Sequence, residues 1–325
     1  MQSKLSSKRM PTSDSAMLPG MSRKPSAKPR ITIVGAGNLA NALALSLHVA
    51  GYEIEQIVSR GHPSSLRRAR RLAHEVGATA VTISRARIQS EVVWFCVPDR
   101  AIATAAKSIA ACADWTGKVA LHSSGALASD ELTALRSQGA AIASVHPLMT
   151  FVPGSRPSLA GVPFAVEGDS AAVRAARRIV KNLGGHAYSI QKEDKAACHA
   201  WGTFASPLLT ALLVTSEHVA AAAGIERKTA KKMMLPIVRQ TLANYADLEA
   251  EQAFSGPLIR GDIETVKRHL HTLRKLPVAQ DVYLSLARAA LAHLPGKNKR
   301  ALEQALKSAR NISARNLSTR ITSRG

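Results

Sequence analysis

The sequence predicts an α/β protein, in which a doubly wound Rossmann-type parallel sheet is followed by an all-α C-terminal domain. Three observations lead to this prediction. Short β-branched runs alternate with helical segments from residue 30 to about residue 190, as in strand–helix units of a parallel sheet. The first of these runs ends in a glycine-rich turn. Past about residue 191 the strand-like runs stop, and helical segments continue to residue 293.

The individual elements follow from these runs. Apolar runs typical of buried parallel strands cover residues 30–37, 52–59, 78–83, 91–98, 117–124, 140–147, 162–168 and 184–190. Long helical segments are predicted at 192–223, 226–249, 262–275 and 277–293. The most apolar stretch, residues 197–224, contains two His, a Pro and a Glu, which favours a buried bundle helix over a membrane span. We therefore predict a sheet domain at 30–190 and a helical domain at 191–296.

The charge of the chain is concentrated at its ends. The formal net charge is +22, and residues 1–30 and 297–325 together hold thirteen of these charges. Basic tails rich in Ser and Lys, without apolar periodicity, are expected to be disordered and solvated. We place these tails at 1–29 and 297–325. A polyanion-binding role for them remains an alternative, although we do not expect a nucleic-acid partner.

Cysteine use and the N-terminus bear on the compartment. Cys96, Cys112 and Cys198 show no CxxC spacing and cannot all pair with one another, which favours a reducing cytoplasm. The N-terminal tail lacks the apolar core of a secretory signal. It resembles a transit peptide in composition, and a start at Met17 or Met21 is an alternative. No His, Cys, Asp or Glu cluster has metal-ligand spacing, so no metal is expected.

The glycine-rich turn predicts a dinucleotide site. Gly35-Ala36-Gly37-Asn38-Leu39-Ala40 has the pattern G-x-G-x-x-A between a strand and a helix. In this context Gly35 permits the tight turn, and Gly37 lets the backbone approach a pyrophosphate. The N–H groups at the start of the following helix, near Asn38 and Leu39, would bind the phosphates. A simple turn without a ligand is the alternative.

The end of the second predicted strand indicates which dinucleotide is bound. No Asp or Glu occurs in residues 57–70, and Ser59 and Arg60 lie where a carboxylate would otherwise bind the ribose hydroxyls. Hydroxyls and a guanidinium favour a 2′-phosphate, so we predict NADP(H) over NAD(H). Alternatively, these arginines form a solvated basic face. Val97 and Pro98 follow the fourth strand and are predicted either to border the nicotinamide or only to lead into a helix.

Four spaced motifs resemble one family. "VALHSSGALASDEL" (119–132), "ASVHPLMTF" (143–151), "KAACHAWGTFAS" (195–206) and "SGPLIRGDIETVKRHL" (255–270) are similar to Rossmann-like proteins with a C-terminal DUF2520 domain. That family is related to pyrroline-5-carboxylate reductases, F420-dependent NADP reductases and the 6-phosphogluconate dehydrogenase-like superfamily. Some members resemble an alternative type of ketopantoate reductase. The resemblance covers about residues 30–295 and implies an oxidoreductase and a homodimer formed through the helical domain.

The reacting centre requires a cationic or acidic donor, because a hydride acceptor must be stabilised and protonated. Lys195 and His199 are four residues apart, hence on one face of a helix, and are predicted to be catalytic. A structural role is the alternative for each. Relatives usually carry Asn at the position of Pro207, and Pro is expected to kink this helix and remove the amide.

Further candidates would bind the substrate. Ser123 and Ser124 lie at a strand end before Gly125 and are predicted to bind a substrate carboxylate, with a helix cap as the alternative. His146 at another strand end and Arg260 before Gly261 are the other substrate-binding candidates. The sequence therefore predicts an NADP(H)-dependent oxidoreductase that reduces a small carboxylate-bearing carbonyl or imine compound, and ketopantoate is the most specific substrate that the resemblance suggests. A catalytically silent NADP(H)-binding sensor or scaffold is the alternative.

Overall fold

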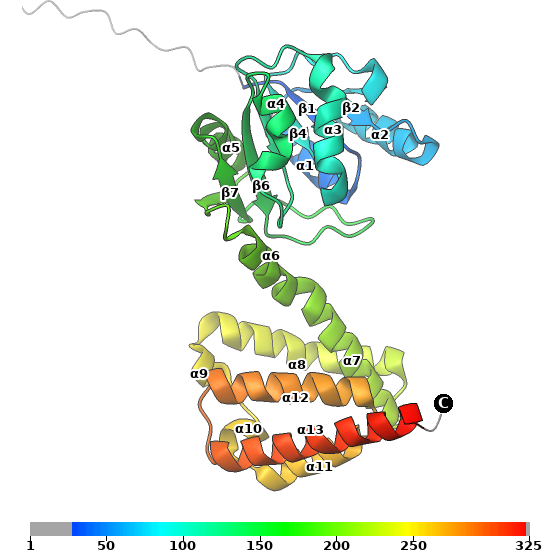
Figure 1. Cartoon of the computed structure of the whole chain (residues 1–325), viewed down its shortest axis with the longest axis vertical. Helices are drawn as coiled ribbons and strands as arrows, with labels where there is room; N and C mark the ends of the chain where they lie inside the picture. The colour runs from blue at the N-terminus through cyan, green and yellow to red at the C-terminus, as the bar shows by residue number, and fades with distance from the viewer. Residues whose placement is uncertain (1–27, 323–325) are drawn as a thin grey trace, which may run out of the picture. The chain divides into compact units, whose positions relative to one another are not determined.

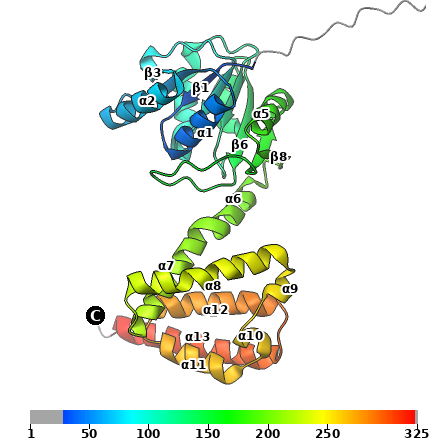
Figure 2. The ribbon, with the colours of Figure 1, turned by 180° about the vertical axis from the view of Figure 1, so that it is seen from behind.

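The computed structural model describes residues 28–322, with side chains through Arg310. It divides into two compact units, Met1–Cys198 and His199–Gly325, which are drawn in Figure 1 and, from behind, in Figure 2. The first unit contains the sheet, and the second is helical. Each unit is described by itself below.

The first unit is built on an eight-stranded sheet with the order β3-β2-β1-β4-β5-β6-β7-β8. Neighbouring strands from β3 to β6 are parallel, β7 is antiparallel to β6, and β8 is parallel to β7. This confirms the predicted doubly wound, mostly parallel sheet. The strands are β1 (Ile31–Val34), β2 (Ile54–Ser59), β3 (Thr79–Thr82), β4 (Val92–Phe95), β5 (Val119–His122), β6 (Ala141–Pro147), β7 (Pro163–Gly168) and β8 (His186–Ser189), each inside one of the predicted runs.

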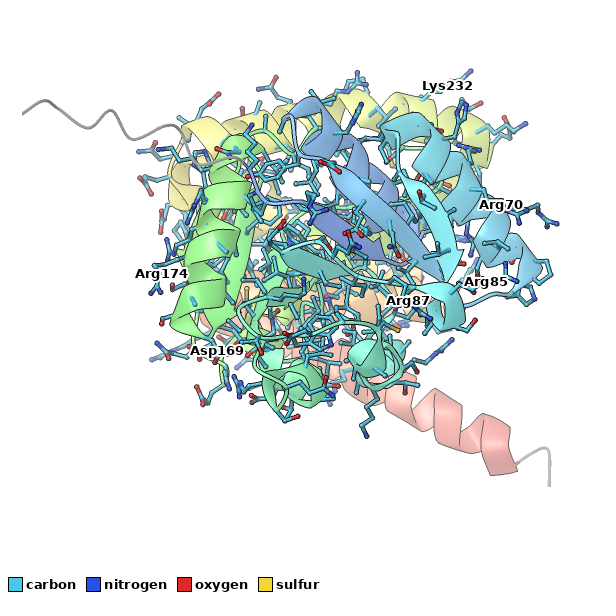
Figure 3. The ribbon with its side chains drawn as sticks, turned by 90° about the horizontal axis from the view of Figure 1, so that it is seen from above. Arg70, Arg85, Arg87, Asp169, Arg174 and Lys232 are labelled. Carbon is cyan, nitrogen blue, oxygen red and sulfur yellow. The ribbon has the colours of Figure 1, made fainter. Side chains whose placement is uncertain are left out.

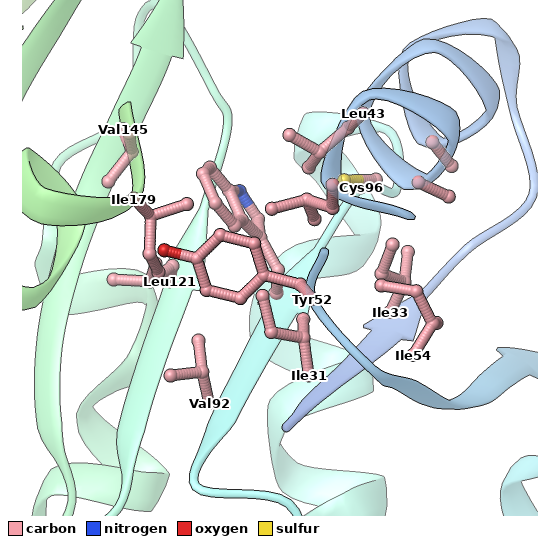
Figure 4. Packing of buried hydrophobic residues seen from close by; sticks show 14 of the residues in the cluster. Ile31, Ile33, Leu43, Tyr52, Ile54, Val92, Cys96, Leu121, Val145 and Ile179 are labelled. Atoms are coloured by element: carbon pink, nitrogen blue, oxygen red, sulfur yellow. The ribbon is translucent and has the colours of Figure 1, made fainter. Parts of the chain in front are cut away.

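Helices cover both faces of the sheet. Successive side chains of a strand point to opposite faces, so apolar residues on both faces need a helix to bury them. In β4, Trp94 belongs to one apolar cluster, while Val93 and Phe95 belong to the other. The first cluster, part of which is drawn in Figure 4, lies under α1 (Asn38–Val49), α2 (Pro63–Val76) and α5 (Ser170–Asn182). The second lies under α3 (Ile102–Ile109) and α4 (Thr133–Arg136). Strands buried on both sides explain the continuous apolar runs of the sequence.

Basic side chains lie on the outer surface of this unit. Helix α2 carries four arginines, all of them exposed, whereas Ala69, Leu72 and Ala73 of the same helix are buried. Figure 3 shows Arg70 extending away from α2. Much of the positive charge of this domain is therefore a solvated helix face.

The second unit consists of helices that follow α6 (Lys195–Thr203), the helix on which the two units divide. Its apolar cluster joins α11, α12 and α13 through Val266, Leu284 and Leu302. The side chain of Asp262 accepts from the Thr265 N–H at 3.0 Å and caps α11. The helices are α7 (Leu209–Ala222), α8 (Arg227–Asp247), α9 (Ala250–Ala253), α10 (Pro257–Arg260), α11 (Ile263–Leu273), α12 (Pro277–His293) and α13 (Lys299–Thr322).

Pro207 changes the local winding of the chain. A π-helical turn, Phe204–Leu208, contains Pro207 and links α6 to α7. A proline within a helix has no N–H for the hydrogen bond to the residue four positions earlier, and a π turn is one way in which a helix accommodates such a break. The stretch Lys195–Ala222 has the length and apolar composition of a membrane span, and none of its most apolar window is buried in the structure. The burial expected of a bundle helix is therefore not observed here.

The prediction of a disordered tail at residues 297–325 was wrong, because α13 begins at Lys299. Leu302, Leu306 and Ala309 are buried in the cluster of the second unit. Their spacing of four and three residues forms an apolar stripe on a helix, which the basic composition of this segment obscures. The predicted N-terminal tail lies outside the described residues, apart from its last two.

Candidate active site

A cavity of about 440 Å³ opens at the carboxyl ends of β1, β2 and β4. In a doubly wound sheet this is where ligands bind, because the strand order reverses between β1 and β4. The cavity brings together six of the eight residues predicted to bind a cofactor: Gly35, Gly37, Ser59, Arg60, Val97 and Pro98. Asn38 and Leu39 are not among its lining residues. The Asn38 amide donates to the Phe151 carbonyl at 3.2 Å, and Leu39 packs against the core.

The two glycines have different roles. Gly35 has a φ of +118°, and an added Cβ would lie 2.3 Å from the carbonyl oxygen of Cys96. The loop after β1 therefore approaches the end of β4 more closely than any side chain would allow. At Gly37 a Cβ would meet nothing within 4 Å, so its backbone faces open space at the start of α1, which has no side-chain cap. A phosphate could reach the free N–H groups there.

The far end of the cavity is suited to an anion. Ser59 is only 4% exposed, and its Oγ has no hydrogen-bond partner among the described residues. A buried hydroxyl without a partner is costly, and because Ser59 lines the cavity, a group bound there could supply the partner. Ser65 and Arg68, on the first turns of α2, also line the cavity, and the Arg68 guanidinium lies 3.4 Å from the Ser65 Oγ.

Ser65 and Arg68 were not predicted as site residues, although their spacing of three on a helix after β2 was a usable signal. Arg67, by contrast, is exposed and does not line the cavity. No carboxylate occurs among the lining residues that the structure describes. The cavity therefore combines a phosphate-accessible backbone with hydroxyls and guanidinium groups.

A second group of polar residues lies at the carboxyl ends of β5 and β6. Lys195, the first residue of α6, is 1% exposed. Its Nζ donates to the carbonyl of Ser124 at 3.1 Å and to the Oγ of Ser144 at 2.7 Å. Burial lowers the pKa of Lys195, and the charges of Glu167, Cys198 and Asp99 oppose this shift. A buried ammonium with a lowered pKa gives up its proton more readily than a solvent-exposed lysine.

The hydroxyls of Ser123 and Ser124 are engaged within the fold. The indole N–H of Trp94 donates to Ser123 Oγ at 2.8 Å. Ser124 Oγ accepts from the N–H groups of Ala126 at 3.2 Å and Leu127 at 2.9 Å. These contacts favour the turn-capping alternative for Ser124, and a substrate-binding role for the two serines stays a prediction.

His122 and His146 hold the loop after β5. His122 Nδ1 accepts from the Ser124 N–H at 3.1 Å, so its Nε2 carries the proton and donates to the Ala128 carbonyl at 3.0 Å. Burial lowers the pKa of His122 to about 4, and the positive charges of Lys195 and His146 act in the same direction. His146 Nδ1 donates to the Ser123 carbonyl at 3.0 Å. Sequence analysis missed His122, although it precedes the two serines.

Family comparisons agree with this arrangement. The model of a Rossmann-like domain matches residues 11–147, and that of a domain of unknown function, DUF2520, matches residues 162–290. The chain carries a Rossmann-like domain followed by a DUF2520 domain. The family resemblance expected from the four motifs is thereby confirmed. No curated protein sequence matches the chain significantly.

Solved structures share the fold over nearly their whole length. A Bacteroides fragilis protein provisionally named an NADP oxidoreductase is 23% identical, with a TM-score of 0.68, covering 81% of this chain and 97% of that one. A Thermotoga maritima protein is 25% identical, with a TM-score of 0.64 and coverage of 86% and 99%. An Aspergillus terreus reductive aminase in complex with NADPH and ethyl-5-oxohexanoate is 15% identical, with a TM-score of 0.59 and coverage of 85% and 99%. Pyrroline-5-carboxylate reductases are also similar.

The DUF2520 domain contains the remaining predicted residues. His199 follows Lys195 by one turn of α6, and its carbonyl accepts from Thr203 Oγ1 at 2.9 Å. Arg260 ends the short helix α10 in the second unit. The roles of His199 and Arg260 stay predictions. Within the described part of the chain, no group of three His, Cys, Asp or Glu side chains could hold a metal ion.

The state of His122 predicts how stability depends on pH. Its folded pKa of about 4 lies below the usual value of 6.5, so the neutral ring favours the folded state above pH 6.5. This contribution, about 3 kcal/mol at 1.4 kcal/mol for each pKa unit, is lost as the pH falls from 6.5 to 4. We expect the free energy of unfolding, measured with urea at a series of pH values, to fall less between pH 6.5 and 4 in His122→Gln than in the wild type.

The matched control is His74→Gln. His74 is exposed on α2, so this variant should keep the pH dependence of the wild type. Equal pH dependence in the wild type and in His122→Gln would show that His122 is not held neutral by the fold.

Proposed function

We propose that this chain is an NADP(H)-dependent oxidoreductase that reduces a small carboxylate-bearing carbonyl or imine compound. The observation that carries this proposal is the cavity beyond β1, β2 and β4, in which the Gly35–Gly37 turn and the unpartnered, buried Ser59 Oγ share one space with Arg60 and Arg68. Proteins of the same fold include a reductive aminase in complex with NADPH. A ketopantoate-like 2-oxo acid is the most specific substrate that the family resemblance suggests.

The residues present are suited to this cofactor. The backbone near Gly37 and the start of α1 would bind the pyrophosphate. Ser59, Arg60 and Arg68 would bind the 2′-phosphate, for which a guanidinium is a planar, permanently charged donor. Val97 and Pro98 would border the nicotinamide. When bound, NADPH supplies the hydride of the reaction.

In this proposal the protein contributes the proton. Reduction of a carbonyl or imine leaves an oxygen or nitrogen that must be stabilised and protonated. Lys195 is the better candidate for this role, because it is a buried ammonium held by two acceptors with a lowered pKa. His199, one turn further along α6, is the second candidate. Ser123, Ser124 or Arg260 would anchor the acid group of the substrate, and His146 is a further candidate for lining the substrate site. The carbonyls of Ser123 and Ser124 accept from His146 and Lys195.

We also propose that the protein is a cytoplasmic homodimer, formed through the helical unit. Large apolar side chains are exposed along α8, where Met233, Ile237 and Tyr245 are each more than 60% exposed. An apolar stripe of this kind is typical of a surface covered by another chain. All three cysteines are free thiols, which suits a reducing compartment.

Cofactor preference is the first prediction. Fluorescence titration should show tighter binding of NADPH than of NADH, and Arg60→Asp should weaken NADPH binding by roughly 10- to 100-fold, because a charge-assisted hydrogen bond is lost and repulsion replaces it. Arg67→Asp is the matched control, since Arg67 is exposed outside the cavity. An equal response of the two variants would mean that the 2′-phosphate does not bind at Arg60.

Turnover is the second prediction. NADPH oxidation with a panel of 2-oxo acids and cyclic imines should fall by about 10²- to 10⁴-fold in kcat in Lys195→Ala, the usual contribution of a general acid, while NADPH still binds. Lys192→Ala removes a partly exposed lysine just before α6 that pairs with Asp130, and this variant should keep the wild-type rate. NADPH binding without turnover of any panel member would instead favour a catalytically silent sensor or scaffold.

Oligomeric state is the third prediction. Sedimentation velocity should give a dimer for the wild type and a shift towards monomer for Ile237→Glu, because a carboxylate would then be buried in an apolar interface. Arg239→Glu changes an exposed residue two positions further along α8 and should leave the dimer intact. A monomeric wild type would contradict the proposal.

A further inference from the structure

Ser144 is a buried polar residue to which neither the sequence motifs nor the proposed function assigns a role. It lies on β6 and is fully buried. A serine hydroxyl has one proton to donate and two lone pairs. The Ser144 Oγ–H donates to the carbonyl of Ser124 at 3.2 Å. A lone pair of the same oxygen is therefore directed at Lys195 Nζ, which donates to it at 2.7 Å.

The three groups form a closed triangle. The Ser124 carbonyl accepts from both Lys195 Nζ and Ser144 Oγ, which uses both of its lone pairs. The backbone of Ser124 is also held on its other side by His122, whose Nδ1 accepts the Ser124 N–H. Two of the three N–H directions of the ammonium are thus set by acceptors that are themselves fixed. Among the residues that the structure describes, the third N–H of Lys195 has no hydrogen-bond acceptor beyond these two.

We propose that Ser144 is a positioning residue: it fixes the rotation of the Lys195 ammonium so that its third N–H is offered to the substrate, and it helps to keep the group protonated. This inference rests on the proposed role of Lys195 as proton donor. Ser144 itself need not touch the substrate, since it acts through Lys195.

The surroundings explain why one hydroxyl matters. Burial disfavours the charged form of Lys195. Glu167 on β7, Asp99 after β4 and Cys198 on α6 favour that form, whereas His122 on β5 is held neutral and so adds no opposing charge. The Glu167 carboxylate is already occupied, accepting from the N–H and Oγ of Ser129 at 2.7 and 2.9 Å. Only the Ser124 carbonyl and Ser144 Oγ accept directly from the ammonium among the contacts described.

The first arm of the test is the pH profile of turnover. A proton donor must be charged, so the rate falls as the pH rises through the pKa of Lys195. In Ser144→Ala the loss of one acceptor for a charged group should move this alkaline limb down by about one pH unit. The same variant should have a kcat about tenfold lower than the wild type, with little change in the KM for NADPH. Ser144→Thr keeps the hydroxyl on a strand that tolerates β-branching and should restore the wild-type profile.

The matched control is Ser90→Ala. Ser90 is equally buried in the same unit, and its hydroxyl donates to Thr32 Oγ1 at 2.9 Å. This variant loses a comparable buried hydrogen bond, so a loss of stability alone would affect both variants, whereas the pH profile should move only in Ser144→Ala. If Ser144→Ala does not fold, Ser144→Cys should show a smaller shift in the same direction, because a thiol is a weaker acceptor.

The second arm does not depend on turnover. Acetic anhydride reacts with the neutral amine, so the pH dependence of Lys195 acetylation, followed by peptide mass spectrometry with Lys192 as an internal reference, measures the pKa of Lys195 directly. The midpoint should lie about one unit lower in Ser144→Ala than in the wild type. An unchanged midpoint would overturn the proposal. Absence of turnover in the wild type would refute the proposed function, while the acetylation result would still decide the role of Ser144 towards Lys195.

Discussion

The parallel direction of the central strands is the constraint on which the rest of the first unit depends. Because β1, β2, β4, β5 and β6 run the same way, the loops that follow them meet at one edge of the sheet. The glycine turn, the hydroxyl-rich end of β2 and the Ser124 carbonyl are thereby brought to the same edge. Lys195 on α6, 160 residues after Gly35, joins this edge through its hydrogen bond to the Ser124 carbonyl. The close approach of Gly35 to the Cys96 carbonyl shows how tightly these loops pack.

Buried polar groups at this edge are satisfied in a particular way. The Lys195 ammonium, the His122 ring and the Glu167 carboxylate each have protein partners, as the cost of burying unpaired polar groups requires. Ser59 differs, since its hydroxyl is buried without a partner among the described residues. That contrast separates the groups that hold the fold together from the position at which an external ligand is expected.

In the helical unit, the overall composition of a segment conceals which of its residues are buried. The segment from Lys299 is strongly basic, yet three of its residues, Leu302, Leu306 and Ala309, pack in the core. Net charge describes the average of a segment, whereas burial depends on which residues share one helical face. Pro207 shows the complementary case, because its effect on backbone winding follows from its covalent structure alone and was expected from the sequence.

The sequence by itself determined the fold class, all the strands of the sheet, the main helices and six of the residues that line the cavity beyond β1, β2 and β4, because periodicity, glycine turns and the absence of carboxylates after β2 are local properties. Tertiary structure alone decided how the polar side chains pair. Ser123 and Ser124 were expected to face a substrate, but Trp94 and the N–H groups of Ala126 and Leu127 engage their hydroxyls. Ser144 was not singled out at all, since its contact with Lys195 joins residues 51 positions apart. A hydrogen bond depends on distance and direction in space, and a linear pattern records neither.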